Sequence, residues 1–295
     1  IQVLGDDRGG VVSLGERECS LQRRHQKVVE EAPSPVVSPQ LRRSMGDAAV
    51  RAAAAVGYRN AGTVEFLLDQ SGEFYFLEMN TRLQVEHPIT ELVTGVDLVR
   101  AQLEIAQGLP LGADLEGTEP RGHAFELRIY AEDPYQQFAP SPGRIQRLRW
   151  PEGPGVRVDS GVYEGSEVTI HYDPLLAKLI VWGSDRAQAL ERMGRALSEI
   201  RIEGIATTIP LYRALLSDDD FRAGRLDNGM LDRKLSAGEL APAKASPVAE
   251  LPLIAAALEH LERTSRLSAL PRDRGSRRGQ WRQAARRDGV RGEWS

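Results

Sequence analysis

The segment from residue 78 to residue 86 constrains the fold most, because its polar and apolar side chains alternate. It reads E-M-N-T-R-L-Q-V-E, so carboxylate, amide or guanidinium groups occupy every second position. In an extended segment, alternate side chains share a face. The pattern therefore predicts one strand with a polar face and a mainly apolar face. An ordinary amphipathic strand is the alternative, but Asn and Glu are poor strand formers, which favours a chemical function.

A second carboxylate lies upstream, in a predicted hairpin. The chain reads as strand, tight turn and strand, with Ser71-Gly72 or Gln70-Ser71 at the corner. A loop at Ser71-Gly72 places Glu65 directly opposite Glu78. Two carboxylates so close repel each other unless a cation lies between them or one takes up a proton. Because Mg²⁺ binds carboxylate and phosphate oxygens, the pair predicts a site for a Mg²⁺–nucleotide complex.

Four groups that can carry positive charge crowd into five positions, namely Arg23, Arg24, His25 and Lys27. A solvated charged segment is the ordinary interpretation of such a run, and a histidine beside arginines is also typical of a capping or packing position. Val28 and Val29 follow the run, however, and the segment breaks only at Pro33, so the run reads as part of a strand. Cations opposite an acidic strand suit a polyphosphate that is held with its metal ion.

Together these segments resemble the C-terminal half of the ATP-grasp domain of the biotin carboxylase family. The matching residues are Gln22–Lys27, Glu65 and Glu78–Pro88, and residues 122–134, 138–143 and 172–180 resemble the family's C-terminal domain. The resemblance covers about residues 1 to 235. Because several long motifs occur in the right order, it is specific.

The fold that the resemblance implies is α+β. It comprises the C-terminal part of an ATP-grasp fold, an antiparallel sheet with helices, followed by a smaller strand-rich α+β domain. The predicted parts are the ATP-grasp portion at 1–111, a linker at 112–120, the C-terminal domain at 121–236, and a linker, short helix and Arg-rich tail without fixed structure at 237–295.

The resemblance also implies ATP-dependent carboxylation of biotin by bicarbonate, with a role for each matching residue. Glu65 and Glu78, assisted by Asn80, would hold Mg²⁺ (or Mn²⁺) on the phosphates of ATP, and His25 and Gln22 would contact the nucleotide. Lys27, Arg82, Gln84 and the backbone of Val85 would bind bicarbonate. Glu86 would deprotonate bicarbonate, and Arg128 would stabilise the biotin enolate.

General chemistry agrees with two of these roles. A guanidinium fork matches a small planar anion such as bicarbonate, which suits Arg82. A fixed cation is needed where enolate charge develops, which suits Arg128. Structural ion pairs are the alternatives, formed by Arg82 with Glu86 or by Arg128 with Glu126 or Glu132.

Two rival functions remain open at this stage. One is another ATP-grasp ligase, such as a carbamoyl-phosphate-synthetase type, and the other is a non-catalytic remnant that serves as an assembly surface. The spacing of Arg82, Gln84 and Glu86, together with Arg128, favours biotin carboxylase. The implied partners are bicarbonate, a biotin carboxyl carrier domain, the carboxyltransferase subunit of an acetyl-, propionyl- or methylcrotonyl-CoA carboxylase, and a second copy of the chain bound through its second domain.

The chain begins at Ile1, already inside the implied ATP-grasp domain. The family's glycine-rich flap and the lysines of its first half are therefore expected to be absent, and neither G-x-x-x-x-G-K nor G-x-G-x-x-G occurs in the sequence. We expect the chain alone to bind ATP poorly and to carboxylate little or no biotin.

Composition is typical of a cytoplasmic enzyme, with 41% hydrophobic and 27% charged residues. The one cysteine, Cys19, excludes an internal disulfide, and no apolar run reaches membrane-spanning length. The net charge of −4 hides an asymmetry, because the residues from Arg263 onward carry +7 and the others −11. A nucleic-acid-binding arm is the alternative for this tail, but it lacks an aromatic platform, so neither nucleic acid nor membrane is an expected partner.

Helices are predicted where capping residues precede apolar periodicity. The predicted ranges are 39–57, 89–94, 97–107, 184–200, 209–216, 218–224 and 251–261. The expected buried stripes are Leu41, Met45, Ala48, Ala52 and Ala55 in the first helix, and Ala187, Leu190, Met193, Ala196 and Leu197 in the fourth. His87-Pro88 is expected to end a strand.

Overall fold

The computed structural model describes residues 1–241 and 253–261. Residues 1–241 belong to one compact unit, and the second unit contributes a described helix at 253–261. The helix predicted at 251–261 is therefore confirmed over its described part. The linker predicted at 241–248 lies outside the described residues except for Ala241, and the tail from Arg263 onward also lies outside them.

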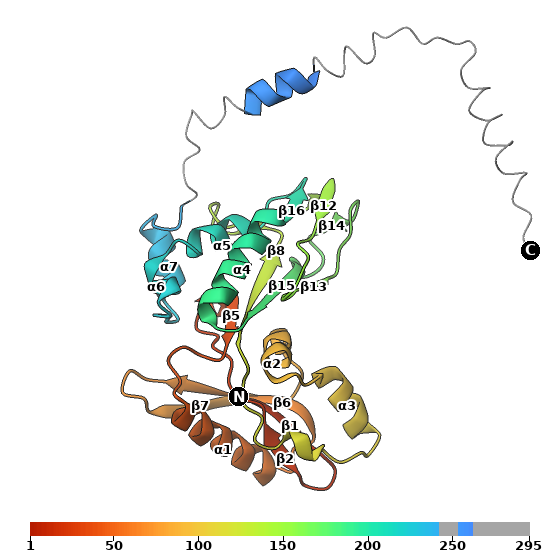
Figure 1. Ribbon diagram of the computed structural model, residues 1–295, viewed down its shortest axis with the longest axis vertical. Coiled ribbons are helices and arrows are strands. Elements are labelled where there is room, and N and C mark those ends of the chain that lie inside the picture. The colour runs from red at the N-terminus through yellow and green to blue at the C-terminus, as the bar shows by residue number, and fades with distance from the viewer. Residues whose placement is uncertain (242–252, 262–295) are drawn as a thin grey trace, which may run out of the picture. The chain divides into compact units, whose positions relative to one another are not determined.

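One antiparallel sheet occupies the lower part of the first unit in Figure 1, with strand order β2-β1-β6-β7. Its strands are β1 (Gln2–Gly5), β2 (Val11–Ser13), β6 (Asn60–Leu68) and β7 (Phe74–Asn80). Helix α1 (Pro39–Ala55) packs on one face and helix α3 (Leu98–Ala106) on the other. Successive residues of β1 accordingly divide between two cores, with Val3 in the cluster of α1 and Leu4 in that of α3.

Helix α1 begins as predicted, but it buries a different stripe. The Ser38 hydroxyl accepts a hydrogen bond from the Leu41 amide at 3.2 Å, and Pro39 occupies the first turn. The buried residues are Met45, Gly46, Ala49 and Ala53, whereas Ala48, Ala52 and Ala55 are half-buried or exposed. The predicted stripe was wrong after Met45, because the buried face continues at every fourth residue, where the strands approach.

A second antiparallel sheet, with order β13-β15-β8-β5, lies above the first in Figure 1. Its strands are β13 (Val156–Ser160), β15 (Leu175–Gly183), β8 (His123–Tyr130) and β5 (Val29–Ala32). The edge strand β5 comes from the first part of the chain and pairs with β8. Helices α4 (Arg186–Glu199) and α5 (Ile209–Leu215) cover one face, and α2 (His87–Thr94) contacts the other.

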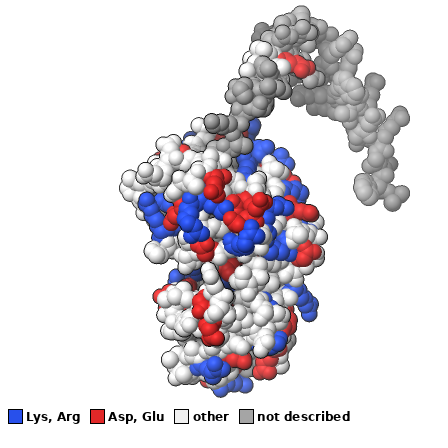
Figure 2. Space-filling view, turned by 90° about the vertical axis from the view of Figure 1, so that its left-hand side faces the viewer, with Lys and Arg blue, Asp and Glu red and all other residues white. Residues whose placement is uncertain are grey.

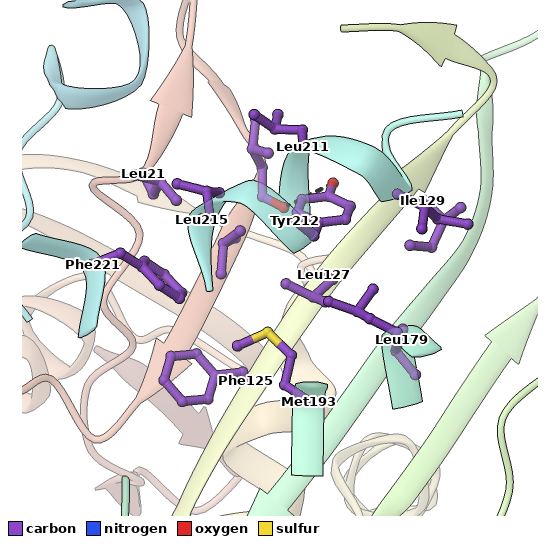
Figure 3. Packing of buried hydrophobic residues seen from close by; sticks show 14 of the residues in the cluster. Leu21, Phe125, Leu127, Ile129, Leu179, Met193, Leu211, Tyr212, Leu215 and Phe221 are labelled. Atoms are coloured by element: carbon purple, nitrogen blue, oxygen red, sulfur yellow. Dashed lines mark hydrogen bonds between the residues drawn. The ribbon is translucent and has the colours of Figure 1, made fainter. Parts of the chain in front are cut away.

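Figure 3 shows the core between the second sheet and its helices. Phe125, Leu127 and Ile129 alternate along β8 and pack toward Met193 of α4 and Tyr212 of α5. The buried face predicted for the fourth helix is confirmed except at its start, where Ala189 is buried and Ala187 is exposed.

The remaining elements are short. They are β3 (Gln22–Arg23), β4 (Gln26–Lys27), β9 (Glu132–Asp133), β10 (Ala139–Pro140), β11 (Gly143–Arg144), β12 (Arg147–Arg149), β14 (Glu167–Val168), β16 (Arg201–Glu203), η1 (Ala113–Leu115), α6 (Asp219–Arg222) and α7 (Met230–Ser236). The antiparallel α+β fold is confirmed, and the boundaries of its two predicted domains stay a prediction. None of the helices in the described ranges is long and apolar enough to cross a lipid bilayer.

The surface charges of the first unit are mixed on the face that Figure 2 displays. Basic and acidic side chains alternate there rather than separate into large areas of one sign. Among the described residues, many charged groups form ion pairs, for example Arg225 with Asp220 and Arg233 with Asp227. This face therefore does not present the concentrated positive field that attracts nucleic acid.

Gly122 directly precedes β8 and offers a test of how closely the second sheet is packed. Its φ is +74°, and a Cβ atom there would overlap the carbonyl oxygen of Gly183 and lie 2.7 Å from the indole nitrogen of Trp182. Gly122→Ala is expected to lower the free energy of unfolding in urea by about 2 to 4 kcal/mol, through backbone strain and overlap. Gly95 is the matched control, since its φ is +77° with no atom within 4 Å. The alanine variant there should cost about 1 kcal/mol, and equal losses at the two glycines would contradict the prediction.

Candidate active site

A large cavity opens beside the first sheet, with a volume of about 1070 Å³. Five of the predicted site residues line it, namely Gln22, His25, Lys27, Glu65 and Gln84. Apolar side chains form another part of the lining, among them Val37, Leu41, Phe66, Leu67 and Leu77. The cavity therefore combines an apolar surface with cationic and acidic groups.

Glu65 and Glu78 lie directly opposite each other on β6 and β7, as predicted. Glu65 is half-buried and Glu78 is exposed. The Asn80 side-chain amide lies between them and donates to Glu78 Oε1 at 3.1 Å and to Glu65 Oε1 at 3.3 Å. The Gln84 amide also donates to Glu65 Oε1, at 2.9 Å, so two carboxylates and two amides meet at this point.

The turn of this hairpin differs from both predicted forms. Asp69 and Glu73 pair across a three-residue loop, and Gly72 has a φ of +88°. The change of register is compensated by a bulge at Leu77, which has no partner between the Glu65–Glu78 and Phe66–Phe76 pairs. The two carboxylates therefore face each other although the predicted loop was wrong.

The alternating segment does not form one strand, which corrects the prediction. Strand β7 ends at Asn80, and residues 81–86 run without regular structure into α2, which begins at His87. Arg82 is exposed and donates to the Leu83 carbonyl oxygen at 3.2 Å, whereas Gln84 and Glu86 are buried. The alternative ion pair between Arg82 and Glu86 is not among the ion pairs of the described residues.

Glu86 is a deeply buried acid of the site, with 2% of its surface exposed. Its Oε1 accepts from Lys27 Nζ at 2.6 Å, and its Oε2 accepts from Arg128 Nη2 at 2.9 Å. Burial alone would raise the pKa of this carboxyl, but the charges of Arg17, Lys27 and Arg128 outweigh it and lower the pKa to about 2. The carboxylate is therefore ionised at neutral pH and shared by two cations.

This lowered pKa makes a prediction for acid stability. Since the folded pKa of Glu86 lies below its ordinary value, its stabilising effect is present above the ordinary value of 4.5 and is lost as pH falls toward 2. Urea unfolding between about pH 6 and pH 3 should show a loss of about 2 kcal/mol that is absent from Glu86→Gln. Parallel curves for the two proteins would contradict the prediction.

Arg128 is also buried, and Glu30 is its second partner. Its Nε donates to Glu30 Oε1 at 2.7 Å, while Nη2 lies 2.5 Å from the same oxygen. The predicted alternatives Glu126 and Glu132 form no ion pair with Arg128 in the described residues, and Glu132 lies 4.0 Å from Arg23 instead. Arg128 is thus an interior cation that joins the second sheet to the end of segment 81–86.

The basic run folds into a small hairpin of its own rather than into one longer strand. β3 and β4 pair around Arg24 and His25, whose φ values are +46° and +66°. Both turn residues are exposed, and His25 lies at the cavity. Arg23 turns away to place its guanidinium 3.9 Å from the centre of the Phe138 ring, so Lys27 is the cation of this run that reaches Glu65 and Glu86.

Sequence reasoning missed three residues that hold the site together. Arg17 donates to Gln84 Oε1 at 2.7 Å and to Thr63 Oγ1 at 2.9 Å. Lys178 donates to the Val85 carbonyl oxygen at 3.0 Å, and Glu30 binds Arg128. Lys178 and Glu30 carried a signal, since each is a charged residue inside an apolar strand sequence, whereas Arg17 carried none.

The donor groups at Glu65 and Glu78 fit Mg²⁺. Two opposed carboxylates with an amide beside them supply the oxygen ligands that Mg²⁺ prefers, and phosphate oxygens usually complete such a site. No group of three or more Asp, Glu, His or Cys side chains gathers to hold a metal within the described ranges. A divalent ion here would accordingly depend on a phosphate-bearing ligand.

Known proteins match both parts of this arrangement. The family "Carbamoyl-phosphate synthase L chain, ATP binding domain" matches residues 1–114, and the family "Biotin carboxylase C-terminal domain" matches residues 126–233. The biotin carboxylase of Haemophilus influenzae is 53% identical over 239 residues, which are 81% of this chain and 53% of the relative. The chain belongs to the biotin carboxylase family.

Other members of the family agree. The biotin carboxylase of a Nostoc species is 53% identical over 230 residues, 78% of this chain and 52% of its own length. The biotin carboxylase domain of Hydrogenobacter thermophilus 2-oxoglutarate carboxylase, solved as a dimer with MgADP, ADP and bicarbonate, superposes with a TM-score of 0.79 at 47% identity, over 82% of this chain and 53% of that one. This chain therefore spans about half the length of these biotin carboxylases.

Proposed function

We propose that this chain carries the bicarbonate-activating and enolate-stabilising half of a biotin carboxylase, an ATP-dependent ligase. The observation that carries the proposal is the buried Glu86 carboxylate between Lys27 and Arg128. A carboxylate held by two cations is ionised, so it can accept a proton, but in this state the cations make it a weak base. It becomes a stronger base when those cations turn to an anionic substrate, because the charges that lower its pKa are then shared.

The other residues take roles around this acid. Lys27, Gln84, Arg82 and the Val85 backbone bind bicarbonate, with Lys178 holding the Val85 carbonyl and Arg17 holding Gln84. Glu86 removes the bicarbonate proton, so that the resulting oxyanion attacks the γ-phosphate of ATP. Arg128 then stabilises the enolate of biotin. Glu65, Glu78 and Asn80 bind Mg²⁺, which neutralises phosphate charge when it is present.

The lining of the cavity supports the nucleotide part of the proposal. An apolar surface suits a purine ring, while Lys27 and the His25 turn supply positive charge for phosphates. Gln22 and His25 are accordingly proposed to contact the nucleotide. Of the two rival functions, a carbamoyl-phosphate-synthetase type is disfavoured by the match of residues 126–233 to the biotin carboxylase C-terminal domain.

The finer assignments are also proposals. The parent enzyme would be an acyl-CoA carboxylase whose partners are a biotin carboxyl carrier domain and a carboxyltransferase subunit. It would dimerise through its second domain. The cytoplasmic location also stays a prediction. The chain alone would turn over little ATP, because its relatives carry about as much sequence again.

A chimera tests the proposal. The part of the Haemophilus influenzae relative that this chain does not cover is joined to it, and phosphate release is measured with MgATP, bicarbonate and biotin. Release that requires both bicarbonate and biotin is the expected result, with little release by the chain alone. A folded chimera that hydrolyses ATP equally well without bicarbonate would overturn the proposal.

A further inference from the structure

Two buried carboxylates next to Arg128 lack the partners that buried charges require. Within the described residues, three buried side-chain oxygens have no hydrogen-bond partner, namely both oxygens of Glu126 and Oε2 of Glu30. Both residues are 0% exposed, and they lie directly opposite each other on β8 and β5. Directly opposed side chains have Cβ atoms about 5 Å apart, so the two carboxyl groups are close neighbours.

Among the cations around this pair, Arg128 binds Glu30 and Glu86, and the ion pairs of the others are with carboxylates outside the pair. The titratable and charged groups around it are Arg128 and Tyr130 on β8, Lys27 on β4, Glu86 before α2, Lys178 on β15, Tyr212 on α5, and Cys19. Arg128 and Lys27 each bind Glu86, and Lys178 binds Asp159 at 3.2 Å. Glu126 therefore has no cation of its own, and ionising both Glu30 and Glu126 would place like charges together in the interior.

We propose that Glu30 and Glu126 hold one proton between them, carried mainly by Glu126, and that the pair is a positioning device for Arg128. Ionised Glu30 holds the guanidinium through one oxygen, so that Nη2 reaches Glu86. Because Glu126 is neutral, the cluster does not contain a further negative charge that lacks a counter-charge. The proton pair stands on its own geometry, and only the role of Arg128 rests on the proposed function.

The ionisation behaviour of the pair agrees with this arrangement. Burial raises the pKa of Glu30 to about 7, although Arg128 opposes the rise. Burial and the neighbouring Glu30 raise the pKa of Glu126 well above its ordinary value. Above about pH 7, Glu30 is therefore mainly ionised while Glu126 keeps its proton, so the pair holds one proton.

Infrared spectroscopy of the chain tests the proton directly, because a neutral carboxylic acid absorbs apart from a carboxylate. At about pH 8, where ordinary Glu side chains are ionised, the unaltered chain should show the neutral band and Glu126→Gln should lack it. Glu16→Gln is the matched control, since Glu16 is buried but bound through both oxygens by Arg42. Absence of the band from the unaltered chain, or its persistence in a folded Glu126→Gln, would overturn the proposal.

Coupling between the two groups is the second readout. In Glu30→Gln the like charge opposite Glu126 is gone, so the band should titrate away at a pH about one unit or more lower. An unshifted titration in a variant with native circular dichroism would overturn the shared proton. These measurements contain no ATP, bicarbonate or biotin, so they can fail while the proposed function stands.

The positioning role needs a catalytic readout, which the chimera supplies. Its kcat is expected to fall at alkaline pH as Glu126 loses its proton, and Glu126→Gln should not show this fall. Identical alkaline limbs in the two chimeras would overturn the positioning role. Because the infrared result does not depend on turnover, an inactive chimera would count against the proposed function and leave the proton pair in place.

Discussion

Replacing Arg128 with methionine is expected to lower the free energy of unfolding by about 3 to 5 kcal/mol at neutral pH. The guanidinium lies between Glu30 and Glu86, which are 0% and 2% exposed. Removing it leaves two buried carboxylates short of a counter-charge, and that cost exceeds the loss of a surface ion pair. Urea unfolding monitored by circular dichroism measures the difference.

The control for this prediction is Arg225→Met. The Arg225 side chain is 64% exposed and binds Asp220 at 2.7 Å, so its loss should cost less than about 1 kcal/mol. The effect of Arg128→Met should also shrink near pH 5, because Glu30 then takes up a proton and no longer needs a cation. A loss at Arg128 no larger than at Arg225 would show that the two carboxylates do not depend on the guanidinium.

Replacing Glu86 with glutamine in the active chimera is expected to lower bicarbonate-dependent phosphate release by about 100- to 10,000-fold, the range for loss of a general base. Glutamine keeps the size of the side chain, although its one amide oxygen can replace only one of the two oxygens that accept from Lys27 and Arg128. It cannot remove a proton from bicarbonate. The loss should therefore appear in kcat rather than in the KM for ATP.

Glu104→Gln controls for a general effect of removing a carboxylate. Glu104 is 43% exposed and pairs with Arg100 on the outer side of α3, so turnover should stay within about twofold of the unaltered chimera. Turnover by Glu86→Gln within tenfold of that control would exclude Glu86 as the base. The base that removes the bicarbonate proton would then have to be another residue.

Local patterns predicted the hairpin of Glu65 and Glu78 well, but for a partly wrong reason. The alternation of both strands placed the carboxylates on one face, and their opposition is confirmed. The expected two-residue loop was wrong, and the bulge at Leu77 restores the register. A bulge has no strong signature in a single sequence, because it depends on how the hairpin packs and not only on its turn residues.

The alternation from residue 78 to 86 shows the limit of periodicity. It correctly grouped Glu78 and Asn80 on a strand face, yet the strand ends there and the following residues turn toward α2. Pro88 is the second residue of α2 and lies in the first helical turn, where proline is well tolerated. It therefore starts a helix and does not end a strand, as had been predicted. Local sequence alone did not distinguish these two uses of proline.

The partners of the buried charges could not be predicted at all. Glu30 and Arg128 are 98 residues apart, and Lys178 and Val85 are 93 apart. Nothing in the local sequence around Arg128 distinguishes Glu30 from Glu126 or Glu132 as its partner. The choice is made by the pairing of β5 with β8, which is a property of the tertiary fold.

The position of β5 has a consequence for how the molecule could be divided. This strand precedes the first sheet's hairpin in the chain but completes the edge of the second sheet. A protease that cut the exposed backbone near Gly117 would therefore sever the polypeptide without releasing two separate pieces. Expressing residues 121–236 by themselves would instead leave β8 as an edge strand with unpaired backbone N–H and C=O groups, prone to self-association.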